Sequence, residues 1–280
     1  MECIKFSGVS FTYPAEDDEL DQDGEPAARE PVFYDFSAEL PGGFTSLVGP
    51  NGSGKSTFMM LASGRLVPQE GKCFLFGKDI ASLPENQKNL VASVIYQNME
   101  FESKEKVSSL LDFVYKNGAF KGSAKGVHSS DLLKETIEVF EFGNVLGRGL
   151  TELSKGEIQR VLLAFSLLYG SASVFMDEPL FAMEQKQKEA SLAYLKDFCA
   201  ATGTPIFISM HELDLSKKYA QNVLLFYPDR NIDYGTPEEV LTDEDLEKAY
   251  GVPASMLKHA ESMTREELKQ TSDAILKIQK

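Results

Sequence analysis

The stretch Gly49-Pro50-Asn51-Gly52-Ser53-Gly54-Lys55-Ser56-Thr57 decides the fold of this chain. It matches the pattern G-x-x-x-x-G-K-[ST], in which a glycine-rich loop follows a strand and opens a helix. The residues just before it, Phe44 to Val48, form a short apolar run, and Lys55 to Leu66 carries apolar residues at helical spacing. This context predicts a phosphate-binding loop between a buried strand and a helix.

The residue types of this loop suit nucleotide phosphates. The glycines allow backbone N–H groups to point at the β- and γ-phosphates, and the helix adds its positive N-terminal end. Lys55 is expected to neutralise phosphate charge, and the Ser56 hydroxyl is expected to reach Mg²⁺. All residues from Gly49 to Thr57 are therefore candidate ligands of a nucleotide.

A pair of carboxylates follows a second buried strand. Ser173 to Met176 is apolar, and Asp177 and Glu178 come directly after it. Ligand-binding groups of a doubly wound sheet lie at the carboxyl ends of its strands. Asp177 is therefore predicted to hold Mg²⁺, and Glu178 is predicted to orient and deprotonate the attacking water.

The remaining pattern predicts an α/β fold with a mostly parallel sheet. Buried strands alternate with helices along the chain, which is typical of a parallel sheet covered on both faces. The predicted strands of this sheet are Phe44 to Val48, Ser173 to Met176, Pro205 to Met210 and Asn222 to Tyr227. Segments 3–14 and 31–40 alternate apolar and polar residues and predict an antiparallel sheet at one edge.

The predicted helices indicate how the chain is divided. Between about 98 and 170 the pattern is mostly helical, with glycine-rich joints, and predicts a helical subdomain inserted in the core. The segment from Glu184 to Ala201 predicts a further helix, with Gly203 as its C-terminal stop. Thr264 to Glu267 has the spacing of a capping box, so a C-terminal helical extension is expected over 256–280.

Composition and charge exclude several classes of protein. The chain has 280 residues, of which 42% are hydrophobic and 25% charged, an ordinary globular composition. Its formal net charge of −15 repels nucleic acid, so no nucleic-acid partner is expected. The three cysteines have no metal-like spacing, and the N-terminus lacks the apolar segment of a targeting signal. A cytoplasmic location is therefore expected.

The acidic insert between the two edge strands is expected to be dispensable for hydrolysis. Eight of the 43 acidic residues lie between Glu16 and Glu30, and this stretch cannot bury apolar surface. Replacing Asp17 to Glu30 by a short Gly-Ser linker should leave nucleotide affinity and turnover within about twofold, because surface changes have small effects. Nucleotide titration and steady-state turnover measure this. A large loss of turnover in a folded variant would show that the insert reaches the nucleotide or a partner.

Four further motifs together resemble one protein family. Leu153-Ser154-Lys155-Gly156-Glu157-Ile158-Gln159-Arg160 resembles the LSGGQ signature of ABC ATPases. Tyr13, Gln97 and His211 occur in the order of that family's other motifs, before the phosphate loop, after an apolar run and after Ile-Ser-Met. The resemblance covers residues 2–255, so 1–255 is predicted to be one ABC ATPase domain with the fold of a phosphate-loop NTPase (RecA-like).

The resemblance implies ATP and Mg²⁺ as cofactors and gives roles to these residues. Tyr13 looks like the aromatic residue that stacks on adenine. Gln97 looks like the glutamine that contacts Mg²⁺ or the attacking water, and His211 like the histidine that binds the γ-phosphate and positions Glu178. Two ATPase subunits of the family pack head to tail. Ser154 and Gly156 would then meet the γ-phosphate held by the other subunit.

Two departures from the family pattern concern hydrolysis. Lys155 stands where the signature has its first glycine, so its side chain either points away from the phosphates or adds a cation near them. Glu184 stands where the family usually has aspartate, and it is one methylene longer. The departure at Glu184 bears on the contact between the two subunits, whereas Asp177 and Glu178 are intact.

The resemblance is strongest to ATPases of importers. Residues 209–216 and 234–252 look like the corresponding stretches in importers of iron chelates, haem and cobalamin, although the phosphate loop looks equally like that of vitamin, cobalt or zinc importers. The longest uncharged stretch, Val161 to Met176, is shorter than the roughly 20 apolar residues that span a bilayer. Permease subunits on separate chains are therefore expected.

The resemblance to importer ATPases implies a set of partners, and two alternative functions stand beside it. The partners are a second ATPase subunit, identical or different, the permease, and an external substrate-binding protein, with the chain on the inner face of the cell membrane. One alternative is a nucleotide-binding regulatory subunit with weak hydrolysis. The other is an ABC ATPase that acts on DNA or ribosomes, although such proteins carry long coiled coils or two tandem ATPase cores.

Overall fold

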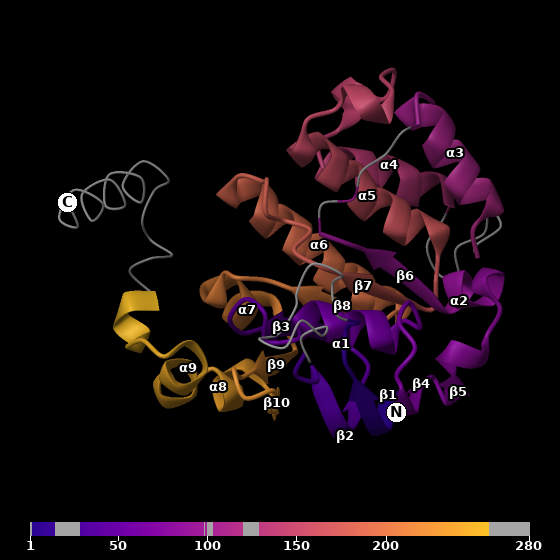
Figure 1. Cartoon of the computed structure of the whole chain (residues 1–280). Coiled ribbons are helices and arrows are strands. Elements are labelled where there is room, and N and C mark those ends of the chain that lie inside the picture. Colours follow the sequence, from indigo (N-terminus) through magenta and orange to yellow (C-terminus); the bar gives the residue numbers. More distant parts are fainter. Residues whose placement is uncertain (1, 15–28, 98, 100–102, 120–128, 258–280) are drawn as a thin grey trace, which may run out of the picture.

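The computed structural model describes residues 2–14, 29–97, 99, 103–119 and 129–257 (Figure 1). Most of the acidic insert and the predicted helix that begins near Thr264 lie outside these residues. Within them, no helix is both long and apolar enough to cross a membrane.

A six-stranded sheet forms the centre of the molecule, and its strand order is β10-β9-β3-β8-β7-β6. Neighbouring strands from β9 to β6 run parallel, and β10 pairs antiparallel with β9. The predicted mostly parallel sheet is therefore confirmed. Its strands are β3 (Phe44–Val48), β6 (Ala92–Ile95), β7 (Ser173–Met176), β8 (Ile206–Ser209), β9 (Asn222–Phe226) and β10 (Ile232–Gly235).

A four-stranded antiparallel sheet lies beside it, with the order β2-β1-β4-β5. The predicted pair of edge strands, β1 (Glu2–Phe11) and β2 (Phe33–Pro41), is present. Sequence patterns did not predict β4 (Glu70–Leu75) and β5 (Lys78–Asp79), in which few side chains are buried.

Helices cover the central sheet and form a layer at one end of it (Figure 1). The layer contains α3, α4 and α5, which are the helices predicted between 98 and 170. The helices are α1 (Lys55–Ala62), α2 (Glu85–Val91), α3 (Val107–Asn117), α4 (Ser129–Val139), α5 (Lys155–Tyr169), α6 (Gln185–Thr202), α7 (Leu213–Tyr219), α8 (Pro237–Val240) and α9 (Asp243–Tyr250). Short 3-10 turns are η1 (Ile80–Ser82), η2 (Gly143–Val145) and η3 (Leu150–Glu152).

Helix α1 is shorter than the segment Lys55 to Leu66 that the apolar spacing predicts. It ends at Ala62, because Gly64 adopts a left-handed φ of 72° and turns the chain. The N–H groups of Arg65 and Leu66 then return to the carbonyl of Met60 instead of continuing the helix. Such a glycine stop is a usual end of a helix.

Two hydrophobic clusters hold the layers of the molecule together, and the first of them fixes the helix after the phosphate loop. One packs the antiparallel sheet onto α1 and the central sheet, and Phe58 lies in it between Phe6 and Phe226 with ring centroids 4.9 and 5.7 Å away. Burial of one such side chain contributes roughly 1.5–3 kcal/mol. The other cluster joins α3, α4 and α5 to β7 and α6. The first cluster therefore holds α1 between the antiparallel sheet and the central sheet.

Candidate active site

The phosphate loop connects β3 to α1, and its backbone requires glycine at its first residue. Gly49 has a φ of 145°, and a Cβ there would lie 2.5 Å from the carbonyl oxygen of Phe226. Gly54 is the N-cap residue of α1 with a φ of 107°. Both angles lie where L side chains are strained. The motif thus folds as the sequence predicts.

The Lys55 ammonium lies across this loop. Its Nζ donates to the carbonyl oxygens of Gly49 and Pro50 at 2.7 and 2.9 Å. Lys55 is only 6% exposed. Burial lowers the pKa of this ammonium, and the carboxylates of Glu178 and Asp177 oppose that effect. A buried cation is therefore held among carbonyls and carboxylates at the place predicted for the phosphates.

The loop also holds an unpaired polar atom. Among the described residues, the hydroxyl of Ser53 is buried and has no hydrogen-bond partner. Buried polar groups without a partner are uncommon and call for an explanation. A phosphate oxygen in this loop would accept that hydrogen bond, so the loop fits the phosphates of ATP.

Ser209, at the end of β8, contacts both acidic residues at the end of β7. The Ser209 hydroxyl donates to Asp177 Oδ1 at 2.6 Å and accepts from the backbone N–H of Glu178 at 2.8 Å. Glu178 has a left-handed φ of 48°, a strained conformation for a side chain of its kind. The turn directs Glu178 away from Asp177, as the sequence predicts for two different roles.

Gln97 and His211 both contact the Glu178 carboxylate. Gln97 Nε2 donates to Glu178 Oε2 at 2.7 Å, and His211 Nε2 lies 2.7 Å from Oε1. Gln97 follows β6 and His211 follows β8, the strands on either side of β7. The carboxylate is therefore oriented by a partner on each oxygen.

These residues meet in a cleft of about 610 Å³. Phe181 lies at its edge and is 62% exposed. The Tyr13 hydroxyl lies 3.1 Å from Thr57 Oγ1, which places the ring at the cleft. The predicted site residues that line the cleft are Tyr13, Asn51, Gly52, Gly54, Lys55, Ser56, Thr57, Gln97, Glu178 and His211. Four further predicted site residues do not line the cleft but lie close to lining residues in the sequence: Gly49, Pro50, Ser53 and Asp177.

The donor set suits Mg²⁺ shared with a nucleotide. Among the described residues, no group of three or more His, Cys, Asp or Glu side chains could hold a metal ion. Mg²⁺ usually takes one or two carboxylates together with substrate phosphates and water. Asp177, Ser56 and Gln97 offer oxygen ligands near the phosphate loop, and this set fits the ion only when a nucleotide is bound.

The signature segment lies elsewhere, at the start of α5. Ser154 is the N-cap residue of α5, and its side chain accepts a hydrogen bond from the N–H of Glu157. A Cβ at Gly156 would lie 2.8 Å from the carbonyl oxygen of Ala182, so the helix closely approaches the loop after Glu178. The residues that line the cleft do not include Ser154 or Gly156.

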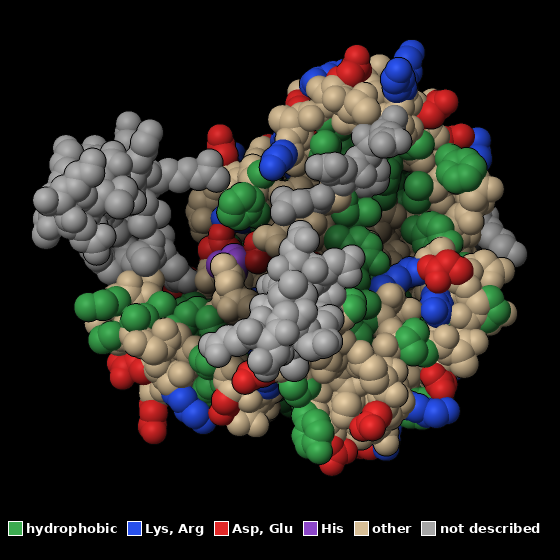
Figure 2. Space-filling view, viewed as in Figure 1, with side chains coloured by type: hydrophobic (Ala, Val, Ile, Leu, Met, Phe, Trp, Pro, Cys, Tyr) green, Lys and Arg blue, Asp and Glu red, His purple; other side chains and the backbone are tan. Residues whose placement is uncertain are grey.

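The structure places both residues that depart from the family pattern, Lys155 and Glu184. Lys155 is exposed and borders an apolar groove of about 350 Å³ between β6 and α5, together with Tyr96 and Met99. Figure 2 shows hydrophobic side chains gathered in the hollow below the helical layer. Glu184 is the N-cap residue of α6, and its N–H donates to Gln187 Oε1 at 3.5 Å.

Sequence reasoning missed two residues that support the site. Ser209 is one, and its only signal is a serine at the end of an apolar strand. The other is Arg230, whose guanidinium donates to the carbonyl of Gly52 in the phosphate loop. Arg230 follows β9 and has a left-handed φ of 70°. No local pattern connects Arg230 with the loop.

Comparisons with known proteins agree on the family. The ABC transporter family model matches residues 35–181. The hemin import ATP-binding protein of Rhizobium meliloti (strain 1021) is 32% identical over 80% of this chain and 87% of its own length. The protein of that name from Pseudomonas aeruginosa is 30% identical over 79% of this chain and 87% of its own.

Solved structures agree on the fold. A metal-chelate type ABC transporter in an inward-facing conformation matches with a TM-score of 0.65 at 19% identity, over 90% of both chains. A dimeric ATP-binding cassette with ADP and phosphate matches with a TM-score of 0.67 at 18% identity, over 84% of this chain and 98% of its own. The predicted phosphate-loop NTPase fold is thus confirmed, and the chain belongs to the ABC transporter family as one of its ATPases.

Proposed function

We propose that the chain is the ATP-hydrolysing subunit of an importer, and that it works as a dimer which closes around ATP on a permease carried by other chains. The observation that carries this proposal is the Glu178 carboxylate, held by Gln97 and His211 beside the phosphate loop. The names of the relatives, which import hemin, support an importer.

In this proposal the residues of the cleft share the work of hydrolysis. The loop N–H groups, Lys55 and Ser53 bind the phosphates of ATP. Asp177, Ser56 and Gln97 would hold Mg²⁺, which supplies charge neutralisation at the phosphates. Glu178 accepts a proton from water as the water oxygen attacks the γ-phosphorus, and ADP and phosphate leave. Gln97 and His211 keep the Glu178 oxygens aimed at that water.

The second subunit completes the site. Ser154 and Gly156 lie outside the cleft of their own chain but at an exposed helix start, so they are available to the γ-phosphate of another chain. A helix N-terminus favours anions. The exposed Phe181 beside the cleft would be covered by the second subunit. The dimer with ADP and phosphate among the solved structures supports this arrangement.

The permease would dock on the apolar groove between β6 and α5. Tyr96 and Met99 line this groove, and Gln97 between them contacts Glu178. A permease segment bound there can therefore shift Gln97 and affect hydrolysis. From the sequence resemblance and the names of these relatives, we infer that the cargo is an iron chelate, haem, cobalamin or a metal ion, delivered by an external binding protein.

Reconstitution with the permease tests this function. Neighbouring open reading frames are searched for a permease, which is co-expressed with the chain. The complex is purified and placed in liposomes, and uptake of haem and of a ferric chelate is measured. We expect ATP-dependent uptake, with none for the Glu178→Gln complex. Association with ribosomes or DNA instead of the permease, or uptake that Glu178→Gln leaves intact, would contradict the proposal. The latter result would favour a regulatory subunit.

A further inference from the structure

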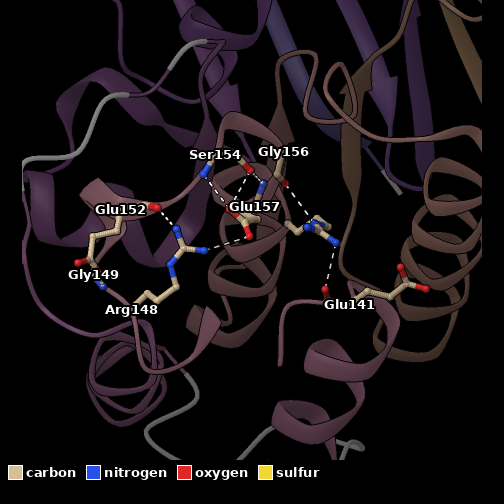
Figure 3. Close-up of polar contacts among 8 residues, drawn as sticks. Glu141, Arg148, Gly149, Glu152, Ser154, Gly156 and Glu157 are labelled. Carbon is tan, nitrogen blue, oxygen red and sulfur yellow. Dashed lines mark hydrogen bonds and ion pairs between the residues drawn. The ribbon is translucent and has the colours of Figure 1, made fainter. Parts of the chain in front are cut away.

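The hydroxyl of the signature serine, Ser154, already donates a hydrogen bond to the carboxylate of Glu157. Ser154 Oγ donates to Glu157 Oε2 at 2.8 Å, and the Ser154 N–H donates to the same oxygen at 2.8 Å (Figure 3). The N–H of Glu157 returns a hydrogen bond to Ser154 Oγ at 3.4 Å. Ser154 and Glu157 therefore form a capping box at the N-terminus of α5.

This carboxylate places negative charge where the proposed dimer brings a γ-phosphate. The hydrogen bonds from Ser154 lower the pKa of Glu157, and the positive charges of Arg148 and Arg160 add to that effect. The Glu157 side chain is only 15% exposed. An ionised, half-enclosed carboxylate repels an incoming phosphate unless a cation compensates its charge.

Arg148 supplies that cation from a fixed position. Its Nη1 donates to Glu157 Oε1 at 3.3 Å, and its Nη2 donates to the carbonyl of Glu152 (Figure 3). The Arg148 backbone is held on both sides, by an N–H bond to Val145 at 2.9 Å and by a bond from the Val107 N–H at 2.9 Å. The guanidinium is therefore anchored next to the signature segment.

Arg160 adds positive charge near Glu157, but its guanidinium donates to backbone carbonyls and not to the Glu157 carboxylate. Arg160 Nη1 donates to the carbonyl of Glu141 at 3.0 Å, and Nε donates to that of Gly156 at 3.3 Å. Figure 3 shows Glu141 on the opposite side of Glu157 from Arg148.

We propose that Arg148 is a positioning residue for ATP-driven dimerisation: its guanidinium compensates the Glu157 carboxylate, so that Ser154 and the start of α5 can receive the γ-phosphate bound by a second subunit. This inference rests on the proposed function. It assigns the role to the charge of Arg148 and not to the hydrogen bond that Arg148 makes with Glu152.

The test measures the ATP-dependent dimer in the full chain carrying Glu178→Gln, by sedimentation. Arg148→Gln keeps a donor for the Glu152 carbonyl but removes the charge. We expect it to raise the dimer dissociation constant about tenfold, which corresponds to about 1.4 kcal/mol. Affinity for fluorescent ATP in the monomer should stay within about twofold, because Arg148 does not line the cleft. Arg148→Lys keeps the charge and should lose at most about threefold.

Rescue by a second substitution separates the charge from a structural role. Adding Glu157→Gln to Arg148→Gln removes the uncompensated carboxylate and should restore the dimer to within about threefold. Lys116→Met is the matched control, since it breaks an exposed ion pair with Asp112 on α3, at 2.7 Å. It should leave the dimer unchanged.

Three outcomes overturn the proposal. A normal dimer with Arg148→Gln does so directly. A weakened dimer that Glu157→Gln fails to restore shows that Arg148 does not act by compensating the Glu157 carboxylate. If the parent Glu178→Gln chain binds ATP without dimerising, the proposed function itself is wrong, and the inference fails with it.

Discussion

Glu178→Gln is expected to lower ATP turnover by on the order of 10²- to 10⁴-fold, the usual cost of removing a general base. The amide has the shape of the carboxylate but cannot accept the proton of the attacking water. Lys55 and the phosphate loop are untouched, so ATP affinity should stay within about threefold. Steady-state turnover and titration with fluorescent ATP measure the two effects separately.

The same variant should accumulate as an ATP-bound dimer, visible as a doubled mass by light scattering. Glu189→Gln is a matched control, because Glu189 is a partly exposed glutamate on α6 that binds Lys218 at 2.6 Å. It should leave turnover unchanged. Near-normal turnover in Glu178→Gln would contradict the assignment of Glu178 as the base.

Lys55→Ala is expected to abolish nucleotide binding at physiological ATP concentrations. It removes a charge-assisted contact to phosphate. The structure adds a second reason, because the carbonyls of Gly49 and Pro50 would lose the ammonium that they bind. Asp177 and Glu178 would also lose their nearby cation, so the cleft would repel the triphosphate.

Fluorescent ATP titration tests this, with thermal unfolding to confirm that the variant is folded. Lys72→Ala removes an exposed lysine that pairs with Asp79 at 2.9 Å, and it should bind ATP normally. If Lys55→Ala bound ATP with unchanged affinity, the loop would not be the phosphate site.

Several elements could be predicted because they depend on short stretches of chain. The apolar runs of β3, β7, β8 and β9 indicate strands buried on both faces, since each is fully or almost fully buried. In contrast, β4 exposes half of its residues, and β10 has none that is fully buried. Pairing with β1 and β9 holds them in the sheets, and this pairing leaves no periodic apolar pattern.

The structural surroundings of Lys155 and Glu184 could not be predicted from the spacing of the motif residues. The position of Lys155 beside the groove follows from the packing of α5 against β6. Glu184 begins α6. Both residues therefore have structural surroundings that the motif pattern does not contain.

By itself, the sequence determined the phosphate loop, the acidic end of β7 and the family. The loop and the acidic strand end each depend on residues within about ten positions of one another, where glycine conformation and a lysine at a fixed offset suffice. The family follows from several such short motifs in a fixed order along the chain. The family resemblance implied that His211 positions Glu178, but only the tertiary structure showed that Gln97 and Ser209 also contact Glu178. Gln97, Ser209 and His211 reach it because β6 and β8 pair on either side of β7. That strand order is set by hydrogen bonding and packing between segments far apart in the chain, so no local pattern contains it.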